Sequence, residues 1–370
     1  MTTVTILGGG AGGGGGGTYL LAIAEELARG GERGISWSMT AQPPLACTLE
    51  GCVPRGVRVI EQPRQAPAAR LLREQLSLRA QEPADVLVAA GNFTPLLRRA
   101  PCVLIAQNAL HFTPVGYGGR QGARIRVEGA LARASIRHAR ATVTPTQAMA
   151  DLIEQRTGRR AIALHFGPAL AARRESGSGP FVFAHRTPWG PHKNLATLLE
   201  ATHLLTRTHA GKFVVRTSCD PCSPFARTFR SSQRERAFLE LPAVRSHVEV
   251  MGFELGSAEH RTVRGDAVVM PSTVESFCFP LAEAAALGLP VAAADTDFAR
   301  EICGRAAFFC APGNAVSLCA AMRRLVDGDR PPSPEPDTVT KISWSRHVDL
   351  LADLCQEIAD RVPARRSATV

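Results

Sequence analysis

Short apolar runs alternate with amphipathic runs along this 370-residue chain, and the alternation begins twice. The first series opens at residues 3–7, an apolar run of strand character. The glycine run Gly8–Gly17 follows, and then Tyr19–Arg29, whose apolar residues have helical spacing. A strand, a glycine turn and a helix are the start of a βαβ unit. Repetition of this order predicts an α/β fold with a parallel, doubly wound sheet.

The rest of the first series keeps the same order. We expect strands at Val57–Ile60, Asp85–Ala89 and Cys102–Ile105, and helices at Arg70–Ala80, Ile125–Arg137 and Gln147–Gln155.

After Ala171–Pro180, which is polar and rich in Gly and Ser, the pattern starts again. We expect strands at Phe181–Ala184, Lys212–Arg216, His247–Met251, Ala267–Met270 and Pro290–Ala294, and helices at Asn194–Thr206, Pro280–Leu287, Ala315–Val326 and Trp344–Arg361.

The two series of alternating strands and helices, in a chain of 370 residues, fit two domains. We predict a Rossmann-like N-terminal domain over residues 1–170, a linker at 171–180 and a second Rossmann-like domain over 181–343. A helix at 344–362 would then return to the first domain. The cleft between two domains is a usual place for a small ligand.

The net charge of +10 comes almost entirely from arginine, which supplies 40 of the 43 basic residues. The arginines are spread along the chain without a block of five or six, which favours anionic ligands in general. No signature of nucleic-acid binding accompanies them. No apolar run reaches the roughly 18 residues of a membrane span, and the sequence opens without a secretory signal. With ten cysteines, we expect a reduced, cytoplasmic setting.

The stretch Pro271–Pro290 (PSTVESFCFPLAEAAALGLP) follows an expected strand and contains two carboxylates. Glu275 lies on the loop, and Glu283 lies about one turn into the helix that Pro280 opens. The free N–H groups of the first helical turn form an anion site. Taken singly, Glu283 could complement the helix dipole and Glu275 could be an exposed loop charge. Together, a phosphate site between two hydroxyl-binding carboxylates is the pattern expected of a nucleotide-sugar site.

This stretch resembles the E-x7-E motif of the retaining glycosyltransferases with the GT-B fold, in family GT4 (glycosyl transferases group 1). About half of the chain resembles the family closely. The similarity continues over residues 248–253, 266–272, 294–302 and 312–318.

The resemblance implies a role for each residue of the motif. Glu275 would contact the transferred sugar, and Glu283 would bind the ribose hydroxyls. Amides of the loop at Phe277, Cys278 and Phe279 would contact the sugar and the phosphate. Many members of the family have glycine where Cys278 stands, so a side chain there would either narrow the sugar pocket or point away from it.

The same resemblance places three further residues in the site. Arg186 and Lys193, in AHRTPWGPHKNL, resemble a basic pair that stabilises charge on the leaving diphosphate. His111, in QNALHF, resembles an active-site histidine of the N-terminal domain, although a lone histidine is more often structural. His165 is expected to be a hinge-side residue.

The glycine run contains a G-x-G-x-x-G pattern, which carries little information in so glycine-dense a segment. A dinucleotide site would need an acidic residue about 20 positions further on, at the end of a second strand. By resemblance to GT-B enzymes, we instead expect this loop near the donor phosphate and the acceptor, with contacts from Gly15, Gly16 and Gly17. The alternative is a flexible loop without ligand contacts.

Two short motifs could suggest a metal but favour another interpretation. Cys219 and Cys222 have CxxC spacing without a second pair, which indicates a loop with two thiols. Asp295 and Asp297 form a D-x-D motif after the wrong strand for a metal site, and GT-B members generally need no metal. We therefore expect no metal and no cofactor other than the nucleotide-sugar donor.

The sequence thus predicts a retaining glycosyltransferase of hexosyltransferase type (EC 2.4). It would move a sugar from a UDP-, GDP- or dTDP-linked donor to a hydroxyl of a natural product or a cell-envelope glycan. In this family the reaction is thought to pass through an oxocarbenium-like state on the front face of the sugar, with the leaving phosphate taking the acceptor proton.

Three alternatives stay open: an epimerase or inverting transferase of the same fold, an NAD(P)-dependent Rossmann oxidoreductase, and a non-catalytic sugar-nucleotide binding protein. Peripheral membrane association also stays open, with Ile125–Arg137 as a weak candidate.

Overall fold

The computed structural model describes residues 1–9, 15–30, 34–43, 45–52, 57–63, 84–95, 100–168, 172–174, 179–252 and 262–361. The chain divides into two compact units. The first unit comprises Met1–Phe112, Arg126–Phe166 and Trp344–Val370, and the second comprises Thr113–Ile125 and Gly167–Ser343.

The first unit is built on a seven-stranded sheet of order β3-β2-β1-β4-β5-β6-β7, in which every neighbouring pair is parallel. Its strands are β1 (Thr2–Leu7), β2 (Ile35–Ala41), β3 (Val57–Glu61), β4 (Val86–Ala89), β5 (Cys102–Ile105), β6 (Ala141–Thr144) and β7 (Ile162–Ala163). The helices are α1 (Gly15–Gly30), α2 (Leu45–Cys52), η2 (Ala109–His111), α4 (Gly119–His138, which starts in the second unit), α5 (Gln147–Thr157) and α13 (Trp344–Asp360).

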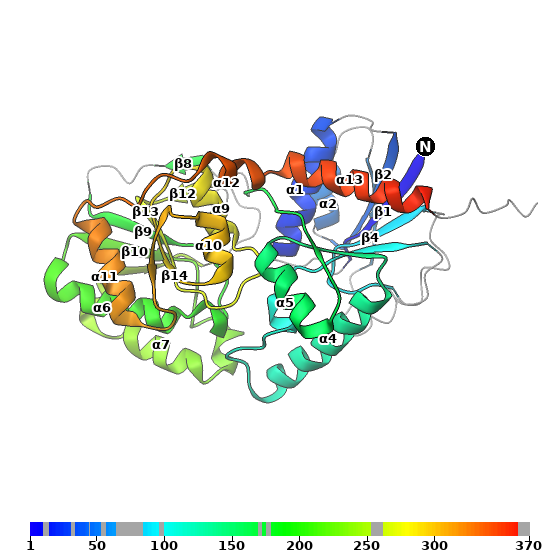
Figure 1. Cartoon of the computed structure of the whole chain (residues 1–370). Helices are drawn as coiled ribbons and strands as arrows, with labels where there is room; N and C mark the ends of the chain where they lie inside the picture. The colour runs from blue at the N-terminus through cyan, green and yellow to red at the C-terminus, as the bar shows by residue number, and fades with distance from the viewer. Residues whose placement is uncertain are drawn as a thin grey trace, which may run out of the picture. The chain divides into compact units, whose positions relative to one another are not determined.

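The second unit is built on a six-stranded parallel sheet of order β11-β10-β9-β13-β14-β15. Helices α6 and α11 cover one face of this sheet, and α9 and α10 cover the other (Figure 1). Its strands are β9 (Phe181–His185), β10 (Phe213–Thr217), β11 (Val248–Val250), β13 (Ala267–Met270), β14 (Val291–Ala294) and β15 (Ala307–Cys310). A small parallel sheet pairs β8 (Ala172–Arg174) with β12 (Thr262–Arg264). The helices are η3 (Pro191–Lys193), α6 (Leu195–His209), η4 (Ala226–Thr228), α7 (Ser231–Leu239), α8 (Pro242–Arg245), α9 (Phe279–Ala286), α10 (Asp297–Cys303), α11 (Ala315–Val326) and α12 (Pro336–Lys341).

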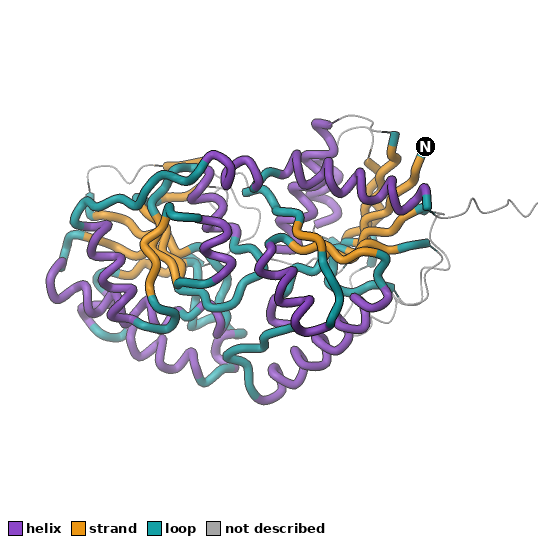
Figure 2. Tube along the Cα trace, in the orientation of Figure 1, coloured by secondary structure: helices purple, strands orange, loops and turns teal. Residues whose placement is uncertain are grey.

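The central strands form because their residues are apolar on both faces. Strands β4, β5, β13 and β14 are buried at every position. Such burial is expected where helices cover both sides of a parallel sheet, as Figure 2 shows for each unit. These runs, bounded by Pro, Gly or charged residues, were the ones whose bounds the sequence predicted best.

The order of strands in each sheet locates a switch point. In the first unit the order reverses between β1 and β4, and in the second between β9 and β13. Open α/β sheets bind ligands outside the carboxyl ends of the strands at this point. In the second unit, the loops that follow β9 and β13 are therefore the place to look for a site.

Helix α13 is held on the first unit by a cluster of four aromatic residues: Tyr19, Phe166, Trp344 and His347. The ring of Trp344 stacks on Phe166, with centroids 5.4 Å apart. His347 Nδ1 lies 3.1 Å from the carbonyl oxygen of Leu164 and donates to it, so Nε2 accepts from the Tyr19 hydroxyl at 3.2 Å. Burial lowers the pKa of His347 to about 4, so the ring is neutral near pH 7.

The predicted α/β fold with two doubly wound parallel sheets is confirmed. Strands β5 and β13 and helix α11 have the predicted bounds. Strands β2, β6, β7, β12 and β15 and helices α2, α7, α8, α10 and α12 were not predicted. The expected helix Arg70–Ala80 lies outside the described residues.

Three local expectations differ from the structure. Gly15–Gly17 form the first turn of α1 rather than a loop, because the helix that buries Tyr19 and Leu20 extends towards the N-terminus through them. Within the expected linker, Ala172–Arg174 form strand β8. Residues 113–125, which we placed in the first domain, cluster with the second unit.

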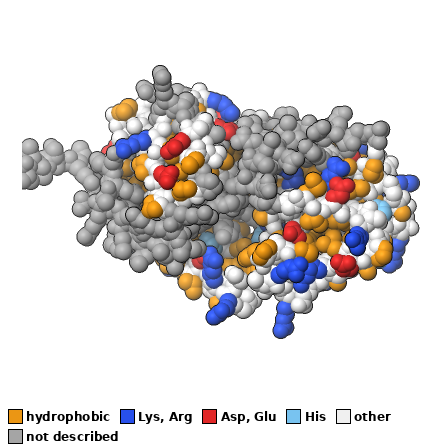
Figure 3. Space-filling model, turned by 180° about the vertical axis from the view of Figure 1, so that it is seen from behind, with side chains coloured by type: hydrophobic (Ala, Val, Ile, Leu, Met, Phe, Trp, Pro, Cys, Tyr) orange, Lys and Arg blue, Asp and Glu red, His pale blue; other side chains and the backbone are white. Residues whose placement is uncertain are grey.

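Basic side chains are interspersed with acidic ones on the face drawn in Figure 3. Within the described residues, no helix is both long enough and apolar enough to cross a bilayer.

Candidate functional site

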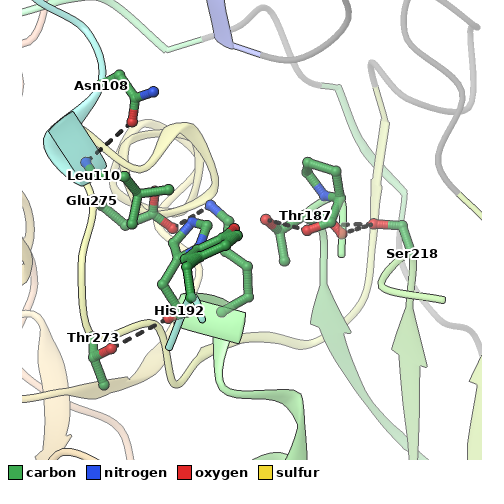
Figure 4. Close-up of polar contacts among 10 residues, drawn as sticks. Asn108, Leu110, Thr187, His192, Ser218, Thr273 and Glu275 are labelled. Atoms are coloured by element: carbon green, nitrogen blue, oxygen red, sulfur yellow. Dashed lines mark hydrogen bonds and ion pairs between the residues drawn. The ribbon is translucent and has the colours of Figure 1, made fainter. Parts of the chain in front are cut away.

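Two loops of the second unit meet at the switch point. Strands β9 and β13 are parallel neighbours, so the loops that follow them, residues 186–194 and 271–278, leave the sheet at the same edge. The backbone N–H of Thr273 donates to the carbonyl oxygen of His192 at 3.0 Å, and the Thr273 hydroxyl approaches the same oxygen (Figure 4). The two loops are therefore tied together by the backbone as well as by side chains.

Two ion pairs join the charged residues that the sequence singled out. Lys193 Nζ lies 2.5 Å from Glu275 Oε1, and each side chain is 12% exposed. Arg186 Nη1 pairs with Glu283 Oε2, and those side chains are 14% and 5% exposed. Each pair joins one residue of the β9 loop to one residue of the β13–α9 segment. Two nearly buried ion pairs thus join the two segments.

The pKa values of the two carboxyl groups shift in opposite directions. Burial disfavours the charged form of Glu275, but Lys193 outweighs it, so the pKa of Glu275 lies below its usual value. Burial raises the pKa of Glu283, and the Arg186 guanidinium opposes this by favouring the carboxylate. An ion pair with so little exposure fixes side-chain positions, because leaving either charge unpaired there would be costly.

Neutral polar groups surround the Lys193–Glu275 pair. The Tyr117 hydroxyl lies 3.2 Å from His192 Nδ1. Burial, with a smaller effect of Glu275, raises the pKa of Tyr117 to about 12. Burial, reinforced by Lys193, lowers the pKa of His192 to about 4 and that of His185 to about 3. None of these three side chains carries a charge near pH 7.

Tyr117 and His192 were missed by the sequence analysis. Tyr117 comes from the segment 113–125 of the second unit, where Gly116 packs so closely that a Cβ would lie 2.7 Å from Pro191 Cβ. Gly116 has a φ of +79°, a conformation that favours glycine. A glycine before a tyrosine is a weak signal, and no local pattern shows which loop the segment contacts.

The helix that carries Glu283 starts at a residue in an unusual conformation. Cys278 is the N-cap of α9 and has φ 72° and ψ 77°. This left-handed conformation costs a non-glycine residue about 1–2 kcal/mol. The side chain is 7% exposed, and burial raises the pKa of its thiol well above the usual range, so it is a neutral thiol. The glycine that many family members have at this position thus fits the backbone without strain.

We expect Cys278→Gly to be more stable than Cys278→Ala by about 1 kcal/mol. Both variants lose the buried thiol, but only glycine relieves the positive φ. In an ordinary helix the order is the opposite, with alanine more stable by about 1 kcal/mol. Urea unfolding of the two variants measures the difference. An alanine variant as stable as the glycine variant would contradict the left-handed N-cap.

Two phenylalanines of the E-x7-E stretch pack against each other at the start of α9. Phe277 is 2% exposed and meets Phe279 edge to face, with ring centroids 5.2 Å apart. Phe279 is the first residue of α9 and is half-buried. The predicted contact of the amides at residues 277–279 with a ligand stays a prediction.

The remaining predicted site residues belong to the first unit. His111 lies in η2 and is 5% exposed; its Nε2 is 3.1 Å from Asn108 Nδ2 and 3.8 Å from Glu128 Oε2. Gly129 of α4 lets the helix approach, because a Cβ there would lie 2.3 Å from the His111 carbonyl oxygen. Gly15, Gly16 and Gly17 start α1. The roles predicted for these residues stay predictions.

Of the two motifs that could suggest a metal, one is engaged in an ion pair and the other consists of free thiols. Asp295, at the end of β14, makes a two-point ion pair with Arg300 at 2.5 and 2.6 Å. Cys219 is buried, Cys222 is exposed, and both are free thiols. Over the described residues, no group of three or more His, Cys, Asp or Glu side chains is placed to hold a metal ion.

Comparison with known proteins adds a family match over part of the chain and a fold. The model of the family described as glycosyl transferases group 1 matches residues 180–328, within the second unit. A search of curated protein sequences found no match.

Solved structures similar to this chain cover nearly all of it. Sucrose-phosphate synthase from Thermosynechococcus elongatus is 14% identical, with 98% of this chain and 97% of that one covered and a TM-score of 0.66. HepE from Anabaena, in complex with UDP and glucose, is 17% identical, with 97% and 99% covered and a TM-score of 0.66. An α,α-trehalose-phosphate synthase (UDP-forming) from Burkholderia vietnamiensis is 9% identical, with 96% and 100% covered and a TM-score of 0.65.

Two doubly wound parallel sheets, together with these neighbours, define the GT-B fold. The family match lies over the sheet and loops that carry the two ion pairs. Residues 180–328 resemble the glycosyl transferases of group 1. This match favours a glycosyltransferase over the oxidoreductase and the non-catalytic binding protein that the sequence left open.

Proposed function

We propose that this protein transfers a sugar from a nucleotide-sugar donor to an acceptor hydroxyl with retention of the anomeric configuration. The observation that carries the proposal is the group of two ion pairs at the switch point of the second sheet. Two cations and two carboxylates lie there on the segments that follow β9 and β13. A donor with a diphosphate between two hydroxyl-bearing rings has the complementary chemistry.

Each residue of the group has a place in this proposal. Arg186 and Lys193 bind the diphosphate and stabilise the charge that develops on it as it leaves. Glu283 accepts hydrogen bonds from the ribose hydroxyls, and Glu275 accepts them from the transferred sugar. Because both cations are already held by carboxylates, they are positioned before the donor arrives.

In the proposed step, the bond between sugar C1 and the diphosphate oxygen breaks. The acceptor oxygen bonds to C1 on the same face, and its proton moves to the departing phosphate oxygen. The protein then needs no carboxylate as a base, which fits a site whose carboxylates are engaged with cations. We propose that no metal takes part, with Arg186 and Lys193 supplying the positive charge, and that the acceptor is a natural product or a cell-envelope glycan.

The first test is a panel of donors. UDP-glucose, UDP-N-acetylglucosamine, GDP-mannose and dTDP-glucose are incubated singly with the protein, with and without a chelator, and release of the nucleoside diphosphate is followed. UDP-glucose comes first, because solved structures of HepE hold UDP or UDP-glucose. We expect one donor class to be hydrolysed in the presence of the chelator. Retention is then tested by the anomeric configuration of the product.

A pair of lysine variants tests the site itself. We expect Lys193→Met to weaken UDP binding at least about tenfold, since a charge-assisted contact is worth about 1.5–3 kcal/mol. Lys212→Met is the matched control, because Lys212 is exposed, just before the start of β10. Circular dichroism serves to check that both variants are folded. Hydrolysis of no donor, or equal UDP affinities for the Lys193 variant and the wild type, would overturn the proposal.

A further inference from the structure

A buried carboxylate contacts the β9 loop and has no part in the proposed reaction. Glu235 lies in the middle of α7 and is 2% exposed. Its Oε2 accepts a hydrogen bond from the indole Nε1–H of Trp189 at 2.6 Å. The backbone N–H of Ala196, in the first turn of α6, also favours the charged form of the carboxyl and so lowers its pKa. Glu235 thus binds the loop and the helix that follows it at once.

Trp189 is the central anchor of that loop, between Arg186 and Lys193 in the sequence. Its ring is 8% exposed and belongs to the core of the second unit, with Phe229 at 5.1 Å and Phe225 at 6.0 Å between ring centroids. A shift of Trp189 would therefore move the backbone that carries both cations.

The ends of the loop are fixed by other contacts. The Thr187 N–H donates to Ser218 Oγ at 2.8 Å, and that hydroxyl donates to the Thr187 carbonyl oxygen at 3.2 Å (Figure 4). The His192 carbonyl accepts from Thr273. Between these ends, Glu235 supplies the polar contact to the Trp189 side chain.

We propose that Glu235 is a positioning residue of the nucleotide-sugar site, whose carboxylate clamps Trp189 and the start of α6 and so sets the positions of Arg186 and Lys193. This inference rests on the proposed function for the role of the two cations. It adds a residue that lies outside the E-x7-E stretch and touches no substrate.

The clamp depends on the ionised carboxylate. Burial raises the pKa of Glu235 to about 7, although Trp189, the Ala196 N–H and Arg236 favour the charged form. The charged and titratable groups that interact with Glu235 are Arg236 on α7 and Cys219 after β10. Protonation adds a buried O–H donor and removes acceptor capacity. The clamp therefore weakens as the pH falls through about 7.

The first test observes the clamp without any ligand. The chain has three tryptophans, so the indole N–H signal of Trp189 is assigned in NMR spectra as the one missing from Trp189→Phe. We expect this signal to shift between about pH 6 and 8 in the wild type, with a midpoint that follows the Glu235 pKa. In Glu235→Gln, which mimics the neutral acid, the signal should not titrate. A Trp189 signal that is unchanged by pH and by Glu235→Gln overturns the clamp.

The second test measures UDP affinity across the same pH range. At pH 8 we expect Glu235→Gln to bind about tenfold more weakly than the wild type, and at pH 6 about equally. The diphosphate also titrates, so the ratio of the two affinities is the quantity compared. With a donor substrate, the variant should raise KM more than it lowers kcat. Glu240→Gln, an exposed change at the end of the same helix, is the control.

A double variant separates the clamp from independent packing effects. Trp189→Phe keeps the ring in the core but removes the N–H donor. If the clamp sets the affinity, Trp189→Phe with Glu235→Gln binds UDP no more weakly than the weaker single variant. If the losses of UDP affinity in the two single variants multiply in the double variant, the inference is overturned.

The pattern of results distinguishes the two proposals. If Lys193→Met weakens UDP binding and Glu235→Gln does not, the proposed function stands and the positioning role falls. If neither the wild type nor any variant binds a nucleotide, the proposed function fails, and the positioning role fails with it. A titrating Trp189 signal together with a pH-dependent affinity ratio supports both.

Discussion

Glu275→Gln is expected to lower sugar transfer at least about a hundredfold while UDP binding stays as tight as in the wild type or becomes tighter. This loss of transfer rate is of the size measured when one charge-stabilising group is removed from an active site. The tighter UDP binding has a separate cause. Glu275 holds Lys193 at 2.5 Å, so a neutral side chain of the same shape leaves the ammonium more available to a diphosphate.

Two measurements on the same protein are needed for this prediction. Isothermal titration calorimetry gives the UDP affinity, and release of the nucleoside diphosphate in the presence of acceptor gives the rate. Glu249→Gln is the matched control, because Glu249 makes a 2.6 Å ion pair with Arg216 at an exposed position on the edge of the same sheet. The control should match the wild type in both measurements. Unchanged transfer in Glu275→Gln, or a tenfold loss of UDP affinity, would contradict the role given to this residue.

The strands were predictable where one local signal dominates. Cys102–Ile105 and Ala267–Met270 are apolar at every position and bounded by Pro or Asp on one side, so periodicity and length place them. The strand Ile35–Ala41 (ISWSMTA) was not predicted, although its apolar residues alternate with polar ones as expected of a half-buried strand. Its place in the sheet comes from pairing with β1 and β3, which the sequence does not display.

The site was predictable in its members but not in their partners. Glu275, Glu283, Arg186 and Lys193 were each found from a local motif, and the structure joins them in two ion pairs. The pairing joins residues 97 and 82 positions apart, and nothing in either stretch says which cation meets which carboxylate. Tyr117 and Glu235 escape for the same reason, since each reaches the β9 loop from a distant part of the chain.

Trp344→Ala is expected to produce the largest loss of stability among the substitutions considered. Trp344 is the first residue of α13 and is 9% exposed. Its ring stacks on Phe166 and meets the edges of Tyr19 and His347, at 5.9 and 5.8 Å between centroids. Removing a buried tryptophan side chain lowers the free energy of unfolding by about 3–5 kcal/mol, because the site cannot fully collapse around the cavity.

The loss should fall on the first unit, where α13 packs, and not on the second. Differential scanning calorimetry would then show one part of the unfolding transition at a lower temperature, while UDP, if the proposed site is right, still stabilises the rest. Leu350→Ala on the same helix is the control, because Leu350 is 38% exposed and its truncation should change stability by less than about 1 kcal/mol. If Trp344→Ala and Leu350→Ala unfold at the same temperature, the aromatic cluster does not hold α13. Trp344→Phe should recover part of the loss, since a ring remains to stack on Phe166.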